Sequence, residues 1–369
     1  MNVQPPKRFC PPGPADVRAG LLGSFRAFPV TSFDRLADCH LHFEGSLPVE
    51  LLEVFARRAG HRFADRALFE EDRSRVRDAK GFLALYAQVC PLFATADDYG
   101  EAASAIAASL QTAGVAYAEI YVSPEIAARC GLDASECLRE IDRGFREAEA
   151  LGAARCSILL DAVRQWGPES AERVLDVHER TGLASVVGFG LGGDETSVPA
   201  AAFAGVYARA RALGLRTSVH AGEWGGADSV TEALDHLRPD RVDHGIAAAS
   251  DPDLLERLAD EATPLWVSPT SNVATGAVES IGEHPLPRLL DAGVRVAIGA
   301  DDPLFFATTT AREHELLREQ LGFGERTMSQ LAENSWRASF LPPSERDRRL
   351  AEVAGRRPPR GRSQPSVSS

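Results

Sequence analysis

Residues 216–245 read RTSVHAGEWGGADSVTEALDHLRPDRVDHG, and this stretch decides the fold. It begins with a short run that contains β-branched residues, Arg216–His220, and it ends with a second short run, Arg241–Asp243. A longer segment rich in Ala, Leu and Glu with helical spacing separates the two runs. A strand, a helix and a second strand in this order form a βαβ unit, so the two strands are expected to be parallel.

The same alternation continues on both sides of this unit. Six further runs of the same kind are Leu36–His42, Val115–Val122, Cys156–Val163, Ala184–Gly190, Pro264–Ser268 and Arg295–Gly299. Eight parallel strands close a (β/α)8 TIM barrel, so we predict an α/β fold of this architecture. A doubly wound open sheet is the competing architecture. It usually binds its ligand through a glycine fingerprint that opens the first helix, and no such fingerprint follows the first run, so the barrel is favoured.

More than seventy residues separate the first two runs, and they contain three segments of helical character. The segments are Pro48–Ala59, Lys80–Phe93 and Ala96–Ala113, which we interpret as a helical insertion after the first strand that caps the barrel mouth. Residues 1–31 are rich in proline and lack periodicity, and residues 351–369 are rich in Arg, Pro and Ser. Both ends are therefore predicted to be mobile or disordered tails, on either side of a single domain over 32–350.

The composition excludes several classes of protein. The 53 acidic and 40 basic residues give a formal net charge of −13, the wrong sign for binding a nucleic-acid polymer or an anionic membrane surface. The six cysteines form no C-x-x-C pair, which argues against a disulfide framework and a thiolate zinc site. The start of the chain lacks the apolar segment of a secretory signal, and no apolar run is long enough to span a bilayer. A cytoplasmic protein is expected.

The candidate functional residues lie where the predicted strands end, because a barrel of this kind carries its active site at the carboxyl ends of its strands. The first run ends in His40 and His42, and strand alternation puts both imidazoles on one face as two ligands for one metal ion. The fifth run is followed by His220 and Glu223, a third imidazole and a carboxyl group. Taken singly, paired histidines can be core residues, and Glu223 can cap the next helix.

Two further strand ends carry acidic and basic groups. The sixth run leads into His244, and the eighth leads into Asp301 and Asp302. Adjacent carboxylates repel each other unless a cation neutralises one of them, although either can also serve as a helix N-cap. Because all these strand ends meet at one barrel mouth, the joint pattern predicts a catalytic metal site.

This constellation resembles the adenosine deaminase family within the metal-dependent amidohydrolase superfamily. The resemblance covers about residues 34–340. Seven family-like signatures carry it: His40–Ser46, Ala118–Pro124, Val187–Glu195, His220–Glu223, Asp243–Gly245, Ser268–Asn272 and Asp301–Pro303. It implies that the domain is a metal-dependent hydrolytic deaminase of a 6-aminopurine, most simply an adenosine-like nucleoside.

The resemblance also implies a role for individual residues. One Zn²⁺ would be bound by His40, His42, His220 and Asp301, and the water that it activates would attack C6 of the purine. Glu223 would donate a proton to ring nitrogen N1, while His244, helped by Asp301, would take or orient the proton of the water. Contacts with the substrate would come from Glu44, from the backbone N–H of Gly193 to N3 and from Asp302 to N7.

Related designs and functions fit less well. A cysteine-ligated deaminase needs a Pro-Cys-x-x-Cys motif, and a binuclear amidohydrolase needs a lysine after the fourth strand; the sequence has neither. A ligand-binding pseudoenzyme would be expected to have lost at least one catalytic or metal-binding residue, and all of them are present. A protein that uses the barrel only as an interaction platform should show a long apolar or charged surface helix, and the sequence predicts none. The substrate stays more open. Adenosine-specific relatives usually have Asp where Glu44 stands. Adenine-specific relatives have Glu there but differ after the fourth strand, where this chain keeps the nucleoside-type Gly193-Asp194-Glu195. Gly190 and neighbouring glycines either leave space for a 5′-extended nucleoside such as 6-aminodeoxyfutalosine or serve turn geometry after strands.

Overall fold

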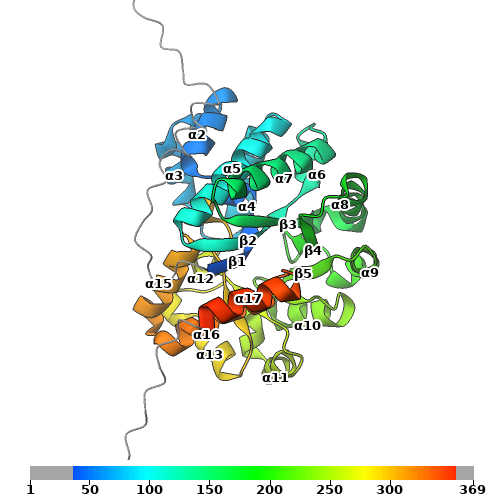
Figure 1. Ribbon diagram of the computed structural model, residues 1–369. Helices are drawn as coiled ribbons and strands as arrows, with labels where there is room; N and C mark the ends of the chain where they lie inside the picture. Colours follow the sequence, from blue (N-terminus) through cyan, green and yellow to red (C-terminus); the bar gives the residue numbers. More distant parts are fainter. Residues whose placement is uncertain (1–35, 355–369) are drawn as a thin grey trace, which may run out of the picture.

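The computed structural model describes residues 36–354, and these residues form a parallel β-barrel surrounded by helices (Figure 1). The sheet contains eight strands in the order of the chain, each parallel to the next. They are β1 (Leu36–His42), β2 (Val115–Val122), β3 (Arg155–Val163), β4 (Val186–Gly192), β5 (Arg216–Ala221), β6 (Arg241–His244), β7 (Leu265–Val267) and β8 (Val296–Ile298). The predicted (β/α)8 TIM barrel is confirmed, and every predicted run coincides with a strand.

The barrel closes between β1 and the residues that follow β8. A β-bridge joins Leu41 to Asp301, and two backbone hydrogen bonds flank it, one from the N–H of His42 to the carbonyl of Asp301 and one from the N–H of Asp301 to the carbonyl of His40, both 3.0 Å. Gly299 permits this approach, since a Cβ atom there would lie 2.8 Å from a carboxylate oxygen of Asp38. Closure therefore occurs at the residues predicted to bind metal.

The helices form a ring outside the sheet. Their bounds are α2 (Val49–Arg58), α3 (Arg66–Arg73), α4 (Ala79–Val89), α5 (Ala96–Thr112), α6 (Pro124–Arg129), α7 (Ala134–Ala150), α8 (Gly167–Thr181), α9 (Ala204–Ala212), α10 (Gly226–His236), α11 (Pro252–Asp260), α12 (Pro269–Ala274), α13 (Leu286–Asp291), α14 (Pro303–Phe306), α15 (Thr310–Leu321), α16 (Glu325–Ala338) and α17 (Pro343–Ala354). In α7, for example, Asp133 caps the first turn, and Leu138, Ile141 and Phe145 lie buried on one face. Among the described helices, none combines the length and the apolar character that a membrane span requires.

The insertion after β1 is shorter than predicted. Helices α2, α3 and α4 form it, and α4 reaches the cavity at the barrel mouth through Phe82 and Tyr86. Helix α5, which the sequence assigned to the same cap, instead packs beside α7 in the outer ring (Figure 1). Gly144 makes this close packing possible, because a Cβ atom there would lie 2.4 Å from the carbonyl oxygen of Gly100. Helix α5 is thus the crossover helix of the first βα unit.

A buried ion pair lies inside the barrel, at the opposite end from the predicted site. Arg241 begins β6 and donates to the carboxylate of Glu119 on β2 over 2.5 Å and to the carbonyl of Cys39 on β1 over 2.8 Å. Both charged side chains are fully buried, and the ring of Phe340 packs over the guanidinium at 4.1 Å. Opposite charges and cation–π contact replace the water that each ion has lost.

The predicted chain ends fall mostly outside the described residues. The predicted tail 1–31 lies there entirely, as does most of the predicted tail 351–369. Helix α17, however, continues past residue 350 to Ala354. Its extension has a physical reason, since Leu350 and Val353 pack against the buried cluster that contains Trp336.

Candidate active site

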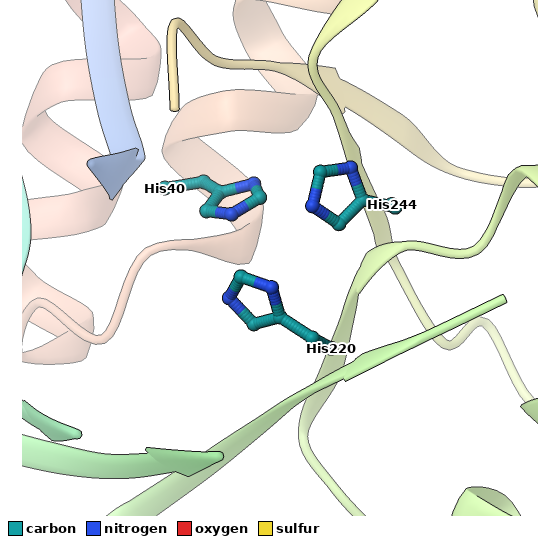
Figure 2. A group of neighbouring side chains, drawn as sticks. All are labelled: His40, His220 and His244. Carbon is teal, nitrogen blue, oxygen red and sulfur yellow. The ribbon is translucent and has the colours of Figure 1, made fainter. Parts of the chain in front are cut away.

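Four imidazoles from three strand ends gather at the mouth of the barrel. His40 and His42 come from β1, His220 from β5 and His244 from the end of β6. The ring centroid of His40 lies 4.8 Å from that of His220 and 4.7 Å from that of His244, and Figure 2 shows these three rings facing one another. The centroid of His42 lies 5.1 Å from that of His220. Strand alternation in β1 and the pairing of β5 with β6 produce this convergence.

Asp301 completes the cluster from the other end of the chain. Its Oδ1 atom lies 3.4 Å from Nε2 of His40 and 3.4 Å from Nε2 of His42. The residue has a φ angle of 61°, a conformation that is uncommon outside glycine, and His244 has a φ angle of 62°. Backbone strain of this kind concentrates at functional sites, where the surrounding hydrogen bonds hold it in place.

The cluster fits a metal ion. The ligand atoms of His40, His42 and Asp301 lie within 4.8 Å of one another, as do those of His40, His220 and His244. The Nε2 atoms of His40 and His220 are buried and have no hydrogen-bond partner, so a cation is the natural group to satisfy them. Burial also lowers the pKa of both rings, which keeps them neutral as metal ligands must be. Nitrogen and carboxylate donors in this number are typical of a catalytic zinc site.

Glu223 and His244 lie next to this cluster. The Nε2 atom of His244 is 3.3 Å from Oε2 of Glu223 and 3.9 Å from Oδ2 of Asp301. Burial, and next the charge of Asp301, raise the pKa of the Glu223 carboxyl well above its ordinary value. A protonated carboxyl group beside a metal-binding cluster can act as a general acid.

A single buried carboxylate organises the loop that carries Glu223. Glu195, which follows β4, accepts hydrogen bonds from four consecutive backbone N–H groups and from the hydroxyl of Ser229. The four N–H groups belong to Gly222, Glu223, Trp224 and Gly225, and the last three lie 3.0, 2.7 and 3.1 Å from Oε2. Charge-assisted bonds to backbone donors are strong, so this carboxylate fixes the path of the chain from His220 to α10.

Two further carboxylates support the cluster from below. Asp243 accepts hydrogen bonds from the hydroxyls of Tyr121 and, at 2.6 Å, of Ser218, and it lies 4.0 Å from Nε2 of His220. Asp38 accepts from the backbone N–H groups of His40 and Ala300 at 3.1 and 3.0 Å. These bonds join strands β1, β2, β5, β6 and β8 around the site, which holds the ligand side chains at fixed positions.

A cavity of about 270 Å³ opens above the cluster. Its walls include the site residues His42, His220, Glu223, His244, Asp301, Asp302 and Gly193, together with the apolar or aromatic side chains Phe82, Leu83, Tyr86, Ile126, Val163, Trp166 and Trp224. Seven of the nine predicted site residues, Gly193 among them, therefore line this cavity. Glu44 does not line it: its carboxylate accepts a hydrogen bond of 2.9 Å from the hydroxyl of Tyr86, which does. His40 is fully buried and does not line the cavity.

The glycines near the cavity do not widen it as predicted. A Cβ atom at Gly190 would lie 2.4 Å from a ring carbon of Tyr121, and one at Gly225 would lie 2.8 Å from Glu195. The space that these glycines leave is thus filled by side chains that position Asp243 and the Glu223 loop. Gly193 has a φ angle of 87°, which other residues rarely adopt. Close packing and turn geometry explain these positions better than room for a larger substrate.

Sequence reasoning missed several residues of the site. Asp161 on β3 lines the cavity and accepts a hydrogen bond of 3.1 Å from the N–H of Gly192. Burial raises the pKa of its carboxyl group to about 7. A carboxyl group within the apolar run Cys156–Val163 was a signal that could have identified it. Asn272, whose amide lies 3.0 Å from Nδ1 of His244, and Glu195 both belong to family-like signatures, but nothing in the sequence indicates what either contacts. Tyr86 left no comparable signal.

Comparison with known proteins agrees with this geometry. A family model described as adenosine deaminase matches residues 36–355. An adenine deaminase of Sinorhizobium medicae (strain WSM419) is 37% identical over 325 residues, which are 88% of this chain and 99% of the relative. The crystal structure of adenine deaminase from Arthrobacter aurescens superposes with a TM-score of 0.81 at 32% identity, covering 87% of this chain and 98% of that chain.

An amidohydrolase from Burkholderia ambifaria, whose crystal structure contains bound Zn, shares the fold. It superposes with a TM-score of 0.81 at 23% identity and covers 90% of this chain and 94% of its own. The matched family and the relatives extend over nearly all of the described residues, including every strand end that contributes to the site. The resemblance seen in the sequence is confirmed: the chain belongs to the adenosine deaminase family and is a hydrolytic deaminase that acts on a C–N bond.

Proposed function

We propose that the chain removes the 6-amino group of free adenine by hydrolysis, with hypoxanthine and ammonia as products. Relatives at 37% and 36% identity and a solved structure at 32% identity all bear the name adenine deaminase. They favour free adenine, which the sequence left as an alternative, over the purine nucleoside that it favoured. The tight packing around Gly190 removes the main argument for a 5′-extended nucleoside.

The observation that carries the chemistry is the contact between the buried Glu223 carboxyl group and the histidine cluster. Its pKa, raised by burial and by the charge of Asp301, favours the protonated form of this carboxyl group. The proton of Glu223 then passes to ring nitrogen N1, which makes C6 electron-poor. The oxygen of water adds to C6, and one proton of the water passes to the amino group. The bond between C6 and the amino nitrogen then breaks, ammonia leaves, and the second proton of the water returns to Glu223 as the oxygen becomes the C6 carbonyl.

The remaining residues bind and orient. We assign His40, His42, His220 and Asp301 to one zinc ion, because their ligand atoms converge and two of the buried nitrogens have no partner. A zinc ion in this position supplies Lewis-acid activation of water. His244 takes or orients the proton of that water from its place between Glu223 and Asp301.

Contacts with the purine come from the cavity wall. Asp302 has a buried Oδ1 atom without a hydrogen-bond partner and a pKa raised by burial and by Asp301, so a protonated Asp302 can donate to N7. The N–H of Gly193 meets N3 in this arrangement. Aromatic side chains such as Tyr86 and Trp166 match the flat face of a purine, and Glu44 acts through the hydroxyl of Tyr86.

The test is ammonia release, with the accompanying ultraviolet shift, from the zinc-loaded protein. The panel contains adenine, adenosine, 2′-deoxyadenosine, 5′-methylthioadenosine and 6-aminodeoxyfutalosine. A kcat/KM for adenine that exceeds the values for all nucleosides supports the proposal, and a preference for any nucleoside overturns the assignment to adenine.

Variants of two glutamates separate the chemistry from general damage. Glu223→Gln should retain zinc and fold yet lose turnover, because an amide cannot deliver the proton to N1. Glu232→Gln is the matched control on α10, since Glu232 accepts a hydrogen bond from the N–H of Ala201 and does not line the cavity. Near wild-type turnover by Glu223→Gln would remove Glu223 from the mechanism.

A further inference from the structure

A chain of buried hydrogen bonds runs from the backbone to His244. The N–H of Leu286 donates to Nδ1 of His284 over 3.1 Å, and Nε2 of His284 lies 3.3 Å from Oδ1 of Asn272. The amide nitrogen of Asn272 in turn lies 3.0 Å from Nδ1 of His244. All three side chains are almost fully buried, so water does not compete for these contacts. The chain starts at α13, passes through α12 and ends on β6.

The backbone group at one end determines the direction of every bond. A backbone N–H can only donate, so Nδ1 of His284 carries no proton and the single proton of the neutral ring lies on Nε2. Burial, and next the nearby His244, lower the pKa of His284 to about 4, and the ring is therefore neutral near pH 7. The N–H at Nε2 donates to Oδ1 of Asn272, which fixes the orientation of the amide group.

The fixed amide then determines which nitrogen of His244 is protonated. The NH₂ group of Asn272 faces Nδ1 of His244 and, at 3.5 Å, Oε1 of Glu223. The amide oxygen cannot take this place, because it accepts the hydrogen bond from Nε2 of His284 on the other side. Since an NH₂ group can only donate, Nδ1 of His244 must accept, and a neutral His244 ring carries its proton on Nε2.

We propose that Asn272 and His284 are positioning residues that hold His244 as the Nε2–H tautomer. In this tautomer the nitrogen that faces the reaction is a hydrogen-bond donor and cannot accept a proton from water. Of the two roles open to His244, taking the proton of the water or orienting it, the geometry therefore selects the second. The inference rests on the proposed function only in taking His244 as part of the reaction site.

The test reads the tautomer directly. Ring nitrogens are recorded by ¹⁵N NMR in the zinc-loaded full chain grown with ¹⁵N-labelled histidine, and the signals of His244 are assigned by their loss in His244→Gln. The wild-type protein should show Nδ1 of His244 without a proton and Nε2 with one. A wild-type spectrum with the proton on Nδ1 would overturn the inference without any variant, and therefore independently of how well each variant folds.

Substitution of Asn272 by Asp replaces the donor that faces Nδ1 of His244 with an acceptor. In Asn272→Asp a carboxylate, which only accepts, replaces the NH₂ group, so the proton of His244 should move to Nδ1. Turnover should fall by about 10- to 100-fold in kcat, with KM nearly unchanged, as expected for a group that orients a catalytic residue. An unchanged tautomer together with an unchanged kcat would contradict the proposal.

Two comparisons distinguish positioning from loss of stability. His284→Phe removes the donor to Asn272 and should reduce kcat, while His284→Gln, whose amide can still donate, should restore part of the loss. Asn334→Asp is the matched control: Asn334 is also buried and donates to the carbonyl of Val296 over 2.8 Å, but it lies outside the site. It should lower stability and leave the His244 spectrum intact. Because the spectrum needs no substrate, failure of adenine turnover would count against the proposed function alone.

Discussion

The carboxylate of Glu195 offers the sharpest test of how the site is held together. In Glu195→Gln one of the two oxygens becomes an NH₂ group, and the side chain loses its charge. The amide oxygen can keep the three N–H groups that now meet Oε2, at 3.0, 2.7 and 3.1 Å. The NH₂ group then faces the N–H of Gly222, which is left buried without an acceptor. Ser229 can rotate its hydroxyl group to accept instead of donate.

The expected cost follows from these contacts. Three charge-assisted bonds become neutral ones, at a loss of roughly 0.5–2 kcal/mol each, and one buried N–H group without an acceptor adds about 1–3 kcal/mol. The free energy of unfolding should therefore fall by about 2.5–9 kcal/mol, a large share of the roughly 5–15 kcal/mol of a typical domain. Any displacement of Glu223 should lower kcat by about 100-fold, since catalysis is sensitive to shifts of about 1 Å.

Urea unfolding of the zinc-loaded protein tests the expected loss of stability, and adenine turnover tests the expected loss of kcat. The control is Glu232→Gln, which weakens a hydrogen bond of 3.2 Å from Ala201, worth about 1 kcal/mol, at a residue that does not line the cavity. Glu195→Gln with the stability and kcat of this control would refute the view that Glu195 organises the loop.

Three other perturbations should give equally distinct results. Between pH 6.5 and about 4 the unfolded chain binds a proton at His284, whereas the folded chain keeps this ring neutral. The free energy of unfolding should therefore be unaffected by His284 above pH 6.5 and should fall by about 3 kcal/mol as the pH decreases from 6.5 to about 4. Urea unfolding of His284→Gln at several pH values should show a flatter slope in this range, and a slope equal to the wild type would contradict the sign. Arg241→Met should destabilise the fold by about 3–5 kcal/mol, because it leaves the Glu119 carboxylate buried without a cation, with hydrogen bonds from Tyr117 and Phe340. A change below about 1 kcal/mol in thermal unfolding would argue against this. Chelation should abolish ammonia release and stoichiometric Zn²⁺ should restore it, whereas turnover by protein shown by mass spectrometry to be metal-free would exclude a role for the ion at His40 and His220.

The strands and the main site residues were predictable because they obey short-range rules. Apolar runs of strand length that end in polar residues predicted all eight strands, and the order of the barrel followed from the regular alternation with helices. Since parallel strands bring their carboxyl ends to one rim, His40, His220 and Asp301 could be expected to converge before any contact was known.

The support behind these residues was not predictable, because it depends on backbone groups that a side-chain pattern does not reveal. Nothing in the sequence shows that Glu195 accepts hydrogen bonds from four backbone N–H groups, or that Nδ1 of His284 accepts one from the N–H of Leu286. Gly190 misled for a similar reason: an absent side chain can mean an open space or a neighbour that fills it, and here Tyr121 fills it. Helix α5 was misplaced because its helical pattern does not say which partner it packs against.

Closure of the barrel at Asp301 has a consequence for biosynthesis. Of the proposed ligands, His40 and His42 are synthesised first, His220 follows after more than half of the chain, and Asp301 comes only after β8, whose following residues bond to β1. Under this assignment a chain that ends before β8 has at most three of the four ligands and should hold a metal ion more weakly than the complete barrel. Retention of the ion would then report that the barrel has closed.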